Sequence, residues 1–203
     1  MSRLSAPTRA LLAGAVCLAI LGGMLGGHAW PLWTGEVVRM KVQPVDPRDL
    51  FRGEFVRLAM PANRMAVSDR PPDTTDNNAL SVRPAGDWKS AADLARYGQL
   101  PRGSFVHVQL EPTAAGDVQA VSASPQPVAG ARNLRGRLRS VDPSSGVIVV
   151  DYGLDAFFMQ EGTARPIEDA IRAGRKVEMD VAIAASGRAR IRNLVVDGQV
   201  VGR

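Results

Sequence analysis

The sequence predicts an α+β protein in which one N-terminal transmembrane helix precedes a mostly antiparallel, β-rich domain built from two ββαββ pseudo-repeats. Three observations predict this architecture. An apolar stretch almost free of charge covers residues 10–33, period-two alternation of apolar and polar residues recurs downstream, and Val45-Asp46-Pro47 returns as Val141-Asp142-Pro143. A chain of 203 residues with 45 % apolar content has room for this helix and one sizeable domain.

The first expected element is the transmembrane helix at residues 10–33. About 20 apolar residues are enough to span a bilayer core of roughly 30 Å. Arg3 and Arg9 precede the stretch with no acidic residue between them, so the positive-inside rule keeps residues 1–9 in the cytoplasm. We therefore expect a single-pass protein that contacts the lipid bilayer through residues 10–33 and carries an extracytoplasmic domain.

A cleaved signal peptide is the alternative, because Gly27-His28-Ala29 resembles a small-x-small cleavage site. The apolar stretch is longer than the roughly 7 to 15 residues of a usual signal core, which favours a retained anchor. Cys17 is the only cysteine and lies within this stretch. The exported domain therefore forms no disulfide, and its stability must come from its core.

The first module covers residues 35–127. Val38, Met40 and Val42 alternate with polar residues, which is the period of a strand that buries one face. Asp46-Pro47 suits a turn, because Asp can bond the backbone ahead of it and Pro fixes its own φ angle. The expected elements are strands at residues 38–43 and 54–60, a long exposed loop at 61–88, a short helix at 90–98, and strands at 105–110 and 118–122.

The second module covers residues 132–203 and repeats this order. In the alignment of the two modules, Leu58 corresponds to Tyr152 and Gly116 to Gly187. Units of about 70 to 80 residues or fewer rarely stand alone without staples, so the modules should pack as one domain. The expected elements are strands at residues 134–138 and 147–152, a helix at 166–174, and strands at 177–183 and 189–191.

Residues 46–60 carry a recognisable signature. The lead-in reads Asp46-Pro47-Arg48-Asp49-Leu50-Phe51-Arg52-Gly53, and the motif proper reads Gly53-Glu54-Phe55-Val56-Arg57-Leu58-Ala59-Met60. This stretch resembles the GDYXXLXY family of bacterial proteins. Three motif positions depart from the family pattern, with Glu54 for Asp, Phe55 for Tyr and Met60 for Tyr. An acidic charge and an aromatic face remain here, whereas the tyrosine hydroxyls are lost.

The resemblance covers most of the exported chain, because later landmarks of the family recur in the second module. The landmarks are Asp46, Pro47, Leu58, Tyr152, Gly153, Glu161 and Gly162. Family members have an N-terminal membrane segment and are often encoded beside a multi-spanning membrane protein. The resemblance therefore implies a protein of the bacterial inner membrane, with a periplasmic domain and an integral membrane protein as partner. It implies no reaction.

The elaborated turn of the first module is the candidate partner-binding site. The second module turns with only Ser144-Ser145-Gly146, so the first turn is longer than the fold requires. Its two guanidiniums can grip carboxylate or phosphate, and its apolar tip can dock on a partner. In the alternative interpretation, Leu50 and Phe51 plug the core and the charges pair locally. The candidate residues are Arg48, Asp49, Leu50, Phe51, Arg52, Gly53, Glu54 and Phe55.

We expect no catalytic residue, no metal and no cofactor. A hydrolase that uses Asp46, Asp49 or Glu54 is an alternative, but glycosidase-type carboxylates face each other at about 5 to 10 Å, which this spacing does not ensure. His28 lies at the membrane boundary and His107 alternates outward on a strand, which argues against a zinc site or a Ser-His-Asp triad. A small-ligand site between the modules is the remaining alternative.

The charge balance argues against nucleic acid as a partner. The chain has 25 Lys and Arg against 20 Asp and Glu, and this excess is small. A local basic run alternates with Leu and Gly and is interpreted as the solvated face of a strand, with anionic lipid headgroups or an acidic partner as the alternative. The run comprises Arg132, Arg135, Arg137 and Arg139. Together these observations favour non-catalytic binding or scaffolding of a membrane or envelope partner.

Overall fold

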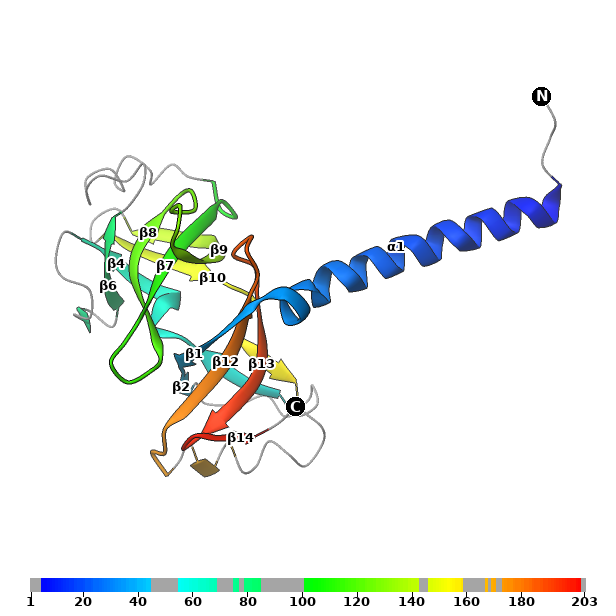
Figure 1. The fold of residues 1–203 in the computed structure, drawn as a ribbon. Coiled ribbons are helices and arrows are strands. Elements are labelled where there is room, and N and C mark those ends of the chain that lie inside the picture. The colour runs from blue at the N-terminus through cyan, green and yellow to red at the C-terminus, as the bar shows by residue number, and fades with distance from the viewer. Residues whose placement is uncertain are drawn as a thin grey trace.

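One long N-terminal helix stands away from a strand-rich domain in the computed structural model (Figure 1). The structure describes residues 5–44, 55–68, 75–76, 79–84, 101–142, 146–158, 167, 169–170 and 173–201. This arrangement confirms the prediction of an apolar helix followed by a β-rich domain. Of the two helices predicted inside the domain, the one at residues 90–98 lies outside the described residues. In the other, Ile167, Asp169 and Ala170 are helical, and both apolar side chains are buried.

The helix α1 (Ala6–Thr34) exposes apolar side chains along most of its length. Leu11, Leu18 and Leu25 are each more than two thirds exposed, at 76, 72 and 71 %. Such surface is unfavourable in water and favourable in hydrocarbon, at about 25 cal/mol per Å². The segment Ala10–Thr34 is long and apolar enough to cross a membrane.

The C-terminal end of α1 is docked on the domain and passes into strand β1 (Glu36–Lys41) through Gly35 alone. The Gly35 N–H donates to the carbonyl oxygen of Pro31 at 2.8 Å, and the Pro31 side chain is buried. A Cβ atom at Gly35 would lie 2.9 Å from the backbone of Ile183 in strand β12 (Val177–Ile183). Glycine is therefore required here by close approach of two backbones.

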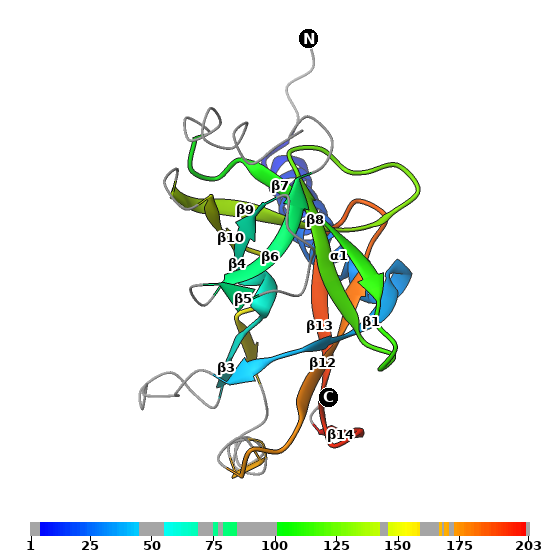
Figure 2. The ribbon, with the colours of Figure 1, turned by 90° about the vertical axis from the view of Figure 1, so that its left-hand side faces the viewer.

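Seven strands form the largest sheet, and six of them close into a ring because β4 pairs with β6 as well as with β10. A closed ring leaves none of its strands with an open edge. Its interior holds fully buried apolar side chains, among them Met65, Val106, Leu134 and Ile148. Figure 2 shows these strands gathered in one half of the domain. In sheet order they are β4 (Arg64–Val67), β10 (Val147–Asp151), β9 (Arg132–Asp142), β7 (Phe105–Pro112), β8 (Val118–Ser124), β6 (Ala79–Pro84) and β5 (Thr75–Asp76).

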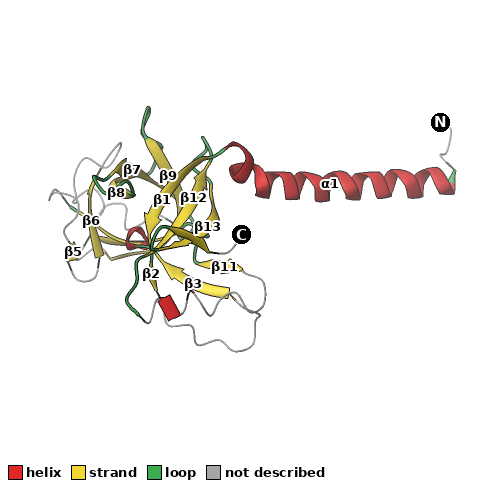
Figure 3. Cartoon of the chain, turned by 60° about the horizontal axis from the view of Figure 1, so that its bottom comes forward, coloured by secondary structure: helices red, strands yellow, loops and turns green. Residues whose placement is uncertain are grey.

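Two smaller sheets complete the domain. One has the order β1-β12-β13-β14, with β13 (Ala189–Val196) and β14 (Gln199–Val201). The other, seen in Figure 3, has the order β11-β3-β2, with β11 (Ala156–Phe158), β3 (Phe55–Ala59) and β2 (Gln43–Pro44). The chain passes from the first of these sheets to the second within a few residues, because only Val42 separates β1 from β2.

The hairpins β7–β8 and β12–β13 confirm two predicted strand pairs and share their details. In both turns the first residue donates its N–H to the carbonyl of the residue four positions on, from Thr113 to Asp117 and from Ala184 to Arg188. Gly116 and Gly187 occupy the same place in these turns, with φ angles of +83° and +78° that favour glycine. Each hairpin also has a β-bulge at the same distance from its turn.

The predicted long exposed loop at residues 61–88 is wrong. This stretch includes the 3-10 helix η1 (Pro61–Asn63) and strands β4, β5 and β6. Met65, Val67 and Val82 from β4 and β6 are among the most deeply buried side chains. The prediction failed because each strand offers only two inward apolar positions, set among prolines and acidic residues. Pairing with neighbouring strands in the ring stabilises these segments as strands, although their local sequence alone does not favour that conformation.

The predicted hairpin between residues 38–43 and 54–60 is correct only at its turn end. There β2 pairs with β3, with Gln43 opposite Ala59 and Pro44 opposite Leu58. The rest of the first strand, β1, pairs instead with β12, so that Val38 lies opposite Val181. The alternation of apolar residues identified the strand, but such a pattern does not specify which strand pairs with it.

Candidate functional site

Most of the predicted partner-binding turn lies outside the described residues. This applies to Arg48, Asp49, Leu50, Phe51, Arg52, Gly53 and Glu54, and to the landmarks Asp46, Pro47, Glu161 and Gly162. The structure does describe the backbone that adjoins both landmark segments. Phe55 begins β3 and Phe158 ends β11, and these two residues are partners in the antiparallel pairing of the strands. The chain therefore leaves residues 45–54 and enters residues 159–166 at neighbouring points, and these two stretches are called the landmark segments below.

The landmarks Leu58 and Tyr152 are core residues. Both side chains are buried, and the Tyr152 hydroxyl donates to the carbonyl oxygen of Ala62 at 2.9 Å. Burial raises the pKa of Tyr152. A Cβ atom at Gly136 would lie 2.8 Å from the Tyr152 ring, so the glycine makes room for the tyrosine. Tyr152 therefore has a structural role, because its contacts join the end of β10 to η1.

Gly153 supports the same corner through its backbone. Its φ angle of +67° lies in the region that favours glycine, and its N–H donates to the Asp151 carboxylate at 2.8 Å. The family landmarks that the structure describes thus build the fold where β10 ends.

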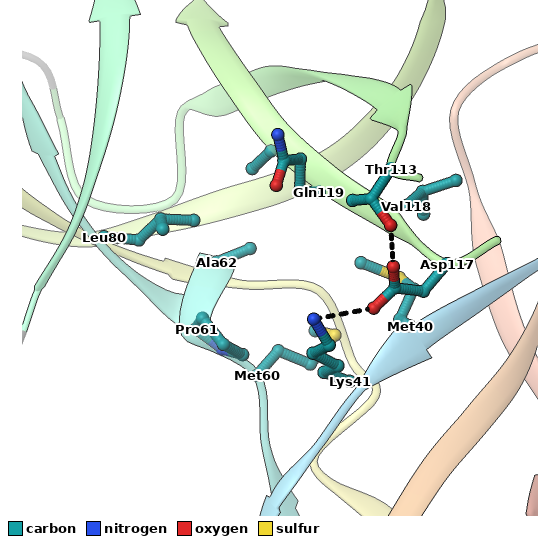
Figure 4. Close-up of a pocket in the computed structure, with 11 residues that line it drawn as sticks. Met40, Lys41, Met60, Pro61, Ala62, Leu80, Thr113, Asp117, Val118 and Gln119 are labelled. Atoms are coloured by element: carbon teal, nitrogen blue, oxygen red, sulfur yellow. Dashed lines mark hydrogen bonds and ion pairs between the residues drawn. The ribbon is translucent and has the colours of Figure 1, made fainter. Parts of the chain in front are cut away.

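An apolar pocket of about 160 Å³ lies beside a buried aspartate (Figure 4). Asp117 is only 2 % exposed in its side chain, and its Oδ2 atom lies 3.0 Å from Nζ of Lys41. Its other carboxylate oxygen accepts a hydrogen bond from the Thr113 hydroxyl. Burial alone would raise the pKa of Asp117, but the hydrogen bonds from Thr113 and Lys41 outweigh it and the pKa is lowered. The apolar lining comes from Met40, Met60, Pro61, Ala62, Leu80 and Val118.

This apolar pocket does not correspond to the predicted ligand site between the two modules. All its lining residues belong to residues 35–127, in β1, in η1 with the preceding Met60, in β6 and in the β7–β8 hairpin. Its volume matches a ligand no larger than a small ring compound. The ion pair of Asp117 and Lys41 closes one wall, and the charge of Asp117 is neutralised there.

A second, open pocket of about 480 Å³ is lined by Phe105 of β7, by β9 and by the start of β13. We call it the arginine pocket after Arg135, Arg137, Arg188 and Arg190. Sequence reasoning found half of it, because Arg135 and Arg137 belong to the basic run predicted on a strand face. It missed Arg188 and Arg190, since only the fold brings the β12–β13 turn against β9. The same run also supplies Arg132 and Arg139, which form ion pairs with Glu36 and Asp151.

The catalytic alternative gains no support from the described residues. Asp46, Asp49 and Glu54 lie outside them, and no group of three or more His, Cys, Asp or Glu within them is placed to hold a metal ion. His107 alternates with Val106 and Val108 and lies on the face of the sheet that carries Arg135 of β9, but its side chain is buried there. Burial and the charge of Arg135 lower the pKa of His107, so it stays neutral at neutral pH.

These observations define a class of protein: a β-rich domain directly joined to an N-terminal apolar helix that can span a membrane. The model of the GDYXXLXY protein family matches residues 17–194, and the chain therefore belongs to this family. No curated protein and no solved structure matches the chain.

Proposed function

We propose that this protein is a single-pass membrane protein whose domain binds or scaffolds an integral membrane protein or envelope partner without catalysis. In this proposal α1 is a retained anchor in the bacterial inner membrane. The N-terminus with Arg3 and Arg9 stays in the cytoplasm, and the β-rich domain lies in the periplasm. Membership of the family and the exposed apolar surface of α1 support the anchor.

The single observation that carries a scaffolding role is the direct junction of α1 and β1. Gly35 alone separates the helix from the sheet, and its close contacts with Pro31 and Ile183 leave no free linker. A domain held in this way keeps one orientation towards the membrane. A fixed orientation suits the presentation of one surface to a neighbouring membrane protein, because little freedom is lost on binding.

We further propose that the partner contacts the turn from Arg48 to Phe55. This turn carries two arginines, a residue type enriched where protein interfaces gain most of their affinity, beside an apolar tip that can dock on a partner. The pairing of Phe55 with Phe158 supports one partner surface formed by both landmark segments, because one segment ends and the other begins at that pair.

Co-purification from solubilised membranes tests the partner site. The double substitution Arg48→Ala with Phe51→Ala should abolish recovery of an integral membrane protein while the domain keeps its thermal unfolding midpoint. Arg83→Ala with Val200→Ala is the matched control, since both side chains are exposed on other parts of the domain. Equal recovery with both double variants would show that the turn is not the partner site.

We also propose that the domain is a duplication in which the modules, residues 35–127 and 132–203, exchange strands. Support comes from the matching turns and bulges of β7–β8 and β12–β13. Support comes also from the strand pairing between modules. The first strand of each module pairs with a later strand of the other module: β1 of the first pairs with β12 of the second, and β9 of the second pairs with β7 of the first. Residues 1–128 and 129–203, made as separate chains, should fold only together. Independent folding of either half would contradict the exchange.

A further inference from the structure

The arginine pocket is built by two strands that the fold brings together. Arg135 and Arg137 are two residues apart on β9 and therefore share one face of the strand. Arg188 ends the β12–β13 turn and Arg190 follows in β13. All four side chains line one open pocket of about 480 Å³.

A glycine holds the two pairs of arginines together. The Gly187 carbonyl oxygen accepts the Arg135 N–H at 2.8 Å, and a Cβ atom at Gly187 would lie 2.9 Å from Cβ of Arg135. The turn is thus pressed against β9 with no room for a side chain between them. The fold therefore holds the backbones that carry the two pairs of arginines against each other.

The positive charge of this pocket is not neutralised by the described residues. Other arginines of the domain have carboxylate partners, as Arg39 has Asp180 at 2.9 Å. Within the described ranges no carboxylate forms an ion pair with the four arginines of the pocket. Asp151 lines the pocket, but it is bound by Arg139 at 3.1 Å and by the N–H of Gly153. The Nε atom of Arg190 is buried and has no hydrogen-bond partner there.

Phe105 holds two of the guanidiniums in place. Those of Arg135 and Arg137 lie 4.6 and 4.8 Å from the centre of the same aromatic ring, which is 43 % exposed. Cation–π contacts orient the guanidiniums without neutralising their charge. Arg137 donates one hydrogen bond to the carbonyl oxygen of Gly103 at 3.2 Å. The other donors of the two planar forks suit an anion with several oxygen acceptors, of which phosphate is the best geometric match.

The pocket lies at the end of α1 that enters the domain. Arg190 donates a hydrogen bond to Nδ1 of His28 on α1 at 2.8 Å. His28 is followed by Trp30 and Trp33, both exposed, before the helix ends. Tryptophans at the end of an apolar span lie at the level of the lipid headgroups. In a chain anchored as proposed above, Arg190 therefore lies near the level of the phosphates of the surrounding leaflet.

We propose that the arginine pocket binds the phosphate of an anionic phospholipid from the leaflet in which the domain sits. The inference rests on the membrane anchoring proposed above. The lipid headgroup supplies the counter-charge that the described residues do not provide, and the acyl chains remain beside α1. Binding would fix the rotation of the domain about the helix axis, because the pocket lies to one side of α1.

Native mass spectrometry of the detergent-solubilised full chain tests this site. The probes are phosphatidylglycerol, which is anionic, and phosphatidylcholine, which carries the same phosphate without net charge. The wild type should retain phosphatidylglycerol over phosphatidylcholine by about tenfold or more. Arg188→Gln with Arg190→Gln should remove this preference, since each basic residue near an anionic lipid surface contributes about fivefold and the two together contribute about 25-fold.

Three comparisons make the result decisive. Arg64→Gln with Arg83→Gln, which removes the same charge from exposed strand positions elsewhere, should keep the preference. If the pocket variant fails to fold, Arg135→Gln with Arg137→Gln should give the same loss. An unchanged preference in a folded pocket variant overturns the proposal, and so does full displacement of the lipid by an equal concentration of soluble glycerol 3-phosphate. Release of the wild type from membranes at alkaline pH would instead refute the anchor.

Discussion

The hydroxyl of Tyr152 donates a hydrogen bond to the carbonyl oxygen of Ala62, which lies 90 residues earlier in the chain. The contact is buried and joins the end of β10 to η1. Together with the pairing of β4 and β10, it fixes the part of the chain that sequence patterns described as a loop. Stability of the ring therefore depends on a bond that spans both halves of the domain.

Tyr152→Phe should destabilise the domain by about 1–2 kcal/mol, because the Ala62 carbonyl would stay buried without its donor. Val200→Ala, at an exposed position, should change stability by less than about 0.5 kcal/mol. Urea unfolding followed by tryptophan fluorescence measures both. Equal midpoints for wild type and Tyr152→Phe would mean that water replaces the hydroxyl.

Gly35→Ala should disrupt the junction of α1 and β1, since the added methyl group would lie 2.9 Å from the Ile183 backbone. We expect a loss of about 1–3 kcal/mol, as for other overpacked sites. Gly14→Ala is the matched control, because nothing lies within 4 Å of a Cβ atom there. The loss should appear in the thermal unfolding of the full chain in detergent. A junction variant as stable as the control would show that the helix end is loosely held.

Gly187→Ala and Gly198→Ala separate backbone strain from close approach. Both glycines have positive φ angles, +78° and +83°, so both substitutions cost about 1 kcal/mol of strain. Only Gly187 lies against Arg135, and its substitution should cost a further 1 kcal/mol or more, on the order expected for overpacking. Chemical denaturation of the two variants gives the difference. Equal losses would mean that the turn can move away from β9.

Asp117→Asn should change how stability depends on acid. The folded pKa of Asp117 is lowered from its ordinary value of 3.8, so the charged form contributes stability above that pH. This contribution is lost as pH falls below about 4 through the folded pKa. The variant should therefore be less stable than wild type at neutral pH, by about 1 kcal/mol, and the gap should narrow in acid. Thermal unfolding at several pH values measures it; a constant gap would exclude this linkage.

How much of the fold the sequence predicts depends on strand length. Long alternating runs such as Val106 to Leu110 and Val177 to Ile183 were found, because each has three or more inward apolar positions. Strands β4 and β6 were missed, since each of them has too few positions to show a period. The partner of β1 was also missed, because alternation reports a buried face and not the strand beside it.

Residues of the candidate sites were predictable only where they belong to one local sequence pattern. Arg135 and Arg137 are visible as a basic strand face, but the arginine pocket also needs Arg188, which is distant in sequence. Leu58 and Tyr152 were chosen as landmarks by resemblance, and their burial assigns them to the core. The burial of Asp117 was not predicted, because a Gly-Asp pair in a turn is usually solvent-exposed.

The pairing of β1 with β12 sets the order of events when the chain is made. Arg39 and Asp180, which form an ion pair across these strands, are 141 residues apart. The strand that emerges first after the apolar helix therefore waits for its neighbour until most of the chain has been synthesised. Contacts between such distant residues form slowly, so the domain cannot complete its fold midway through synthesis. Until β12 has been made, the sheet of β1, β12, β13 and β14 cannot form, and this delay would suit passage of the chain through a translocation channel in the export proposed above.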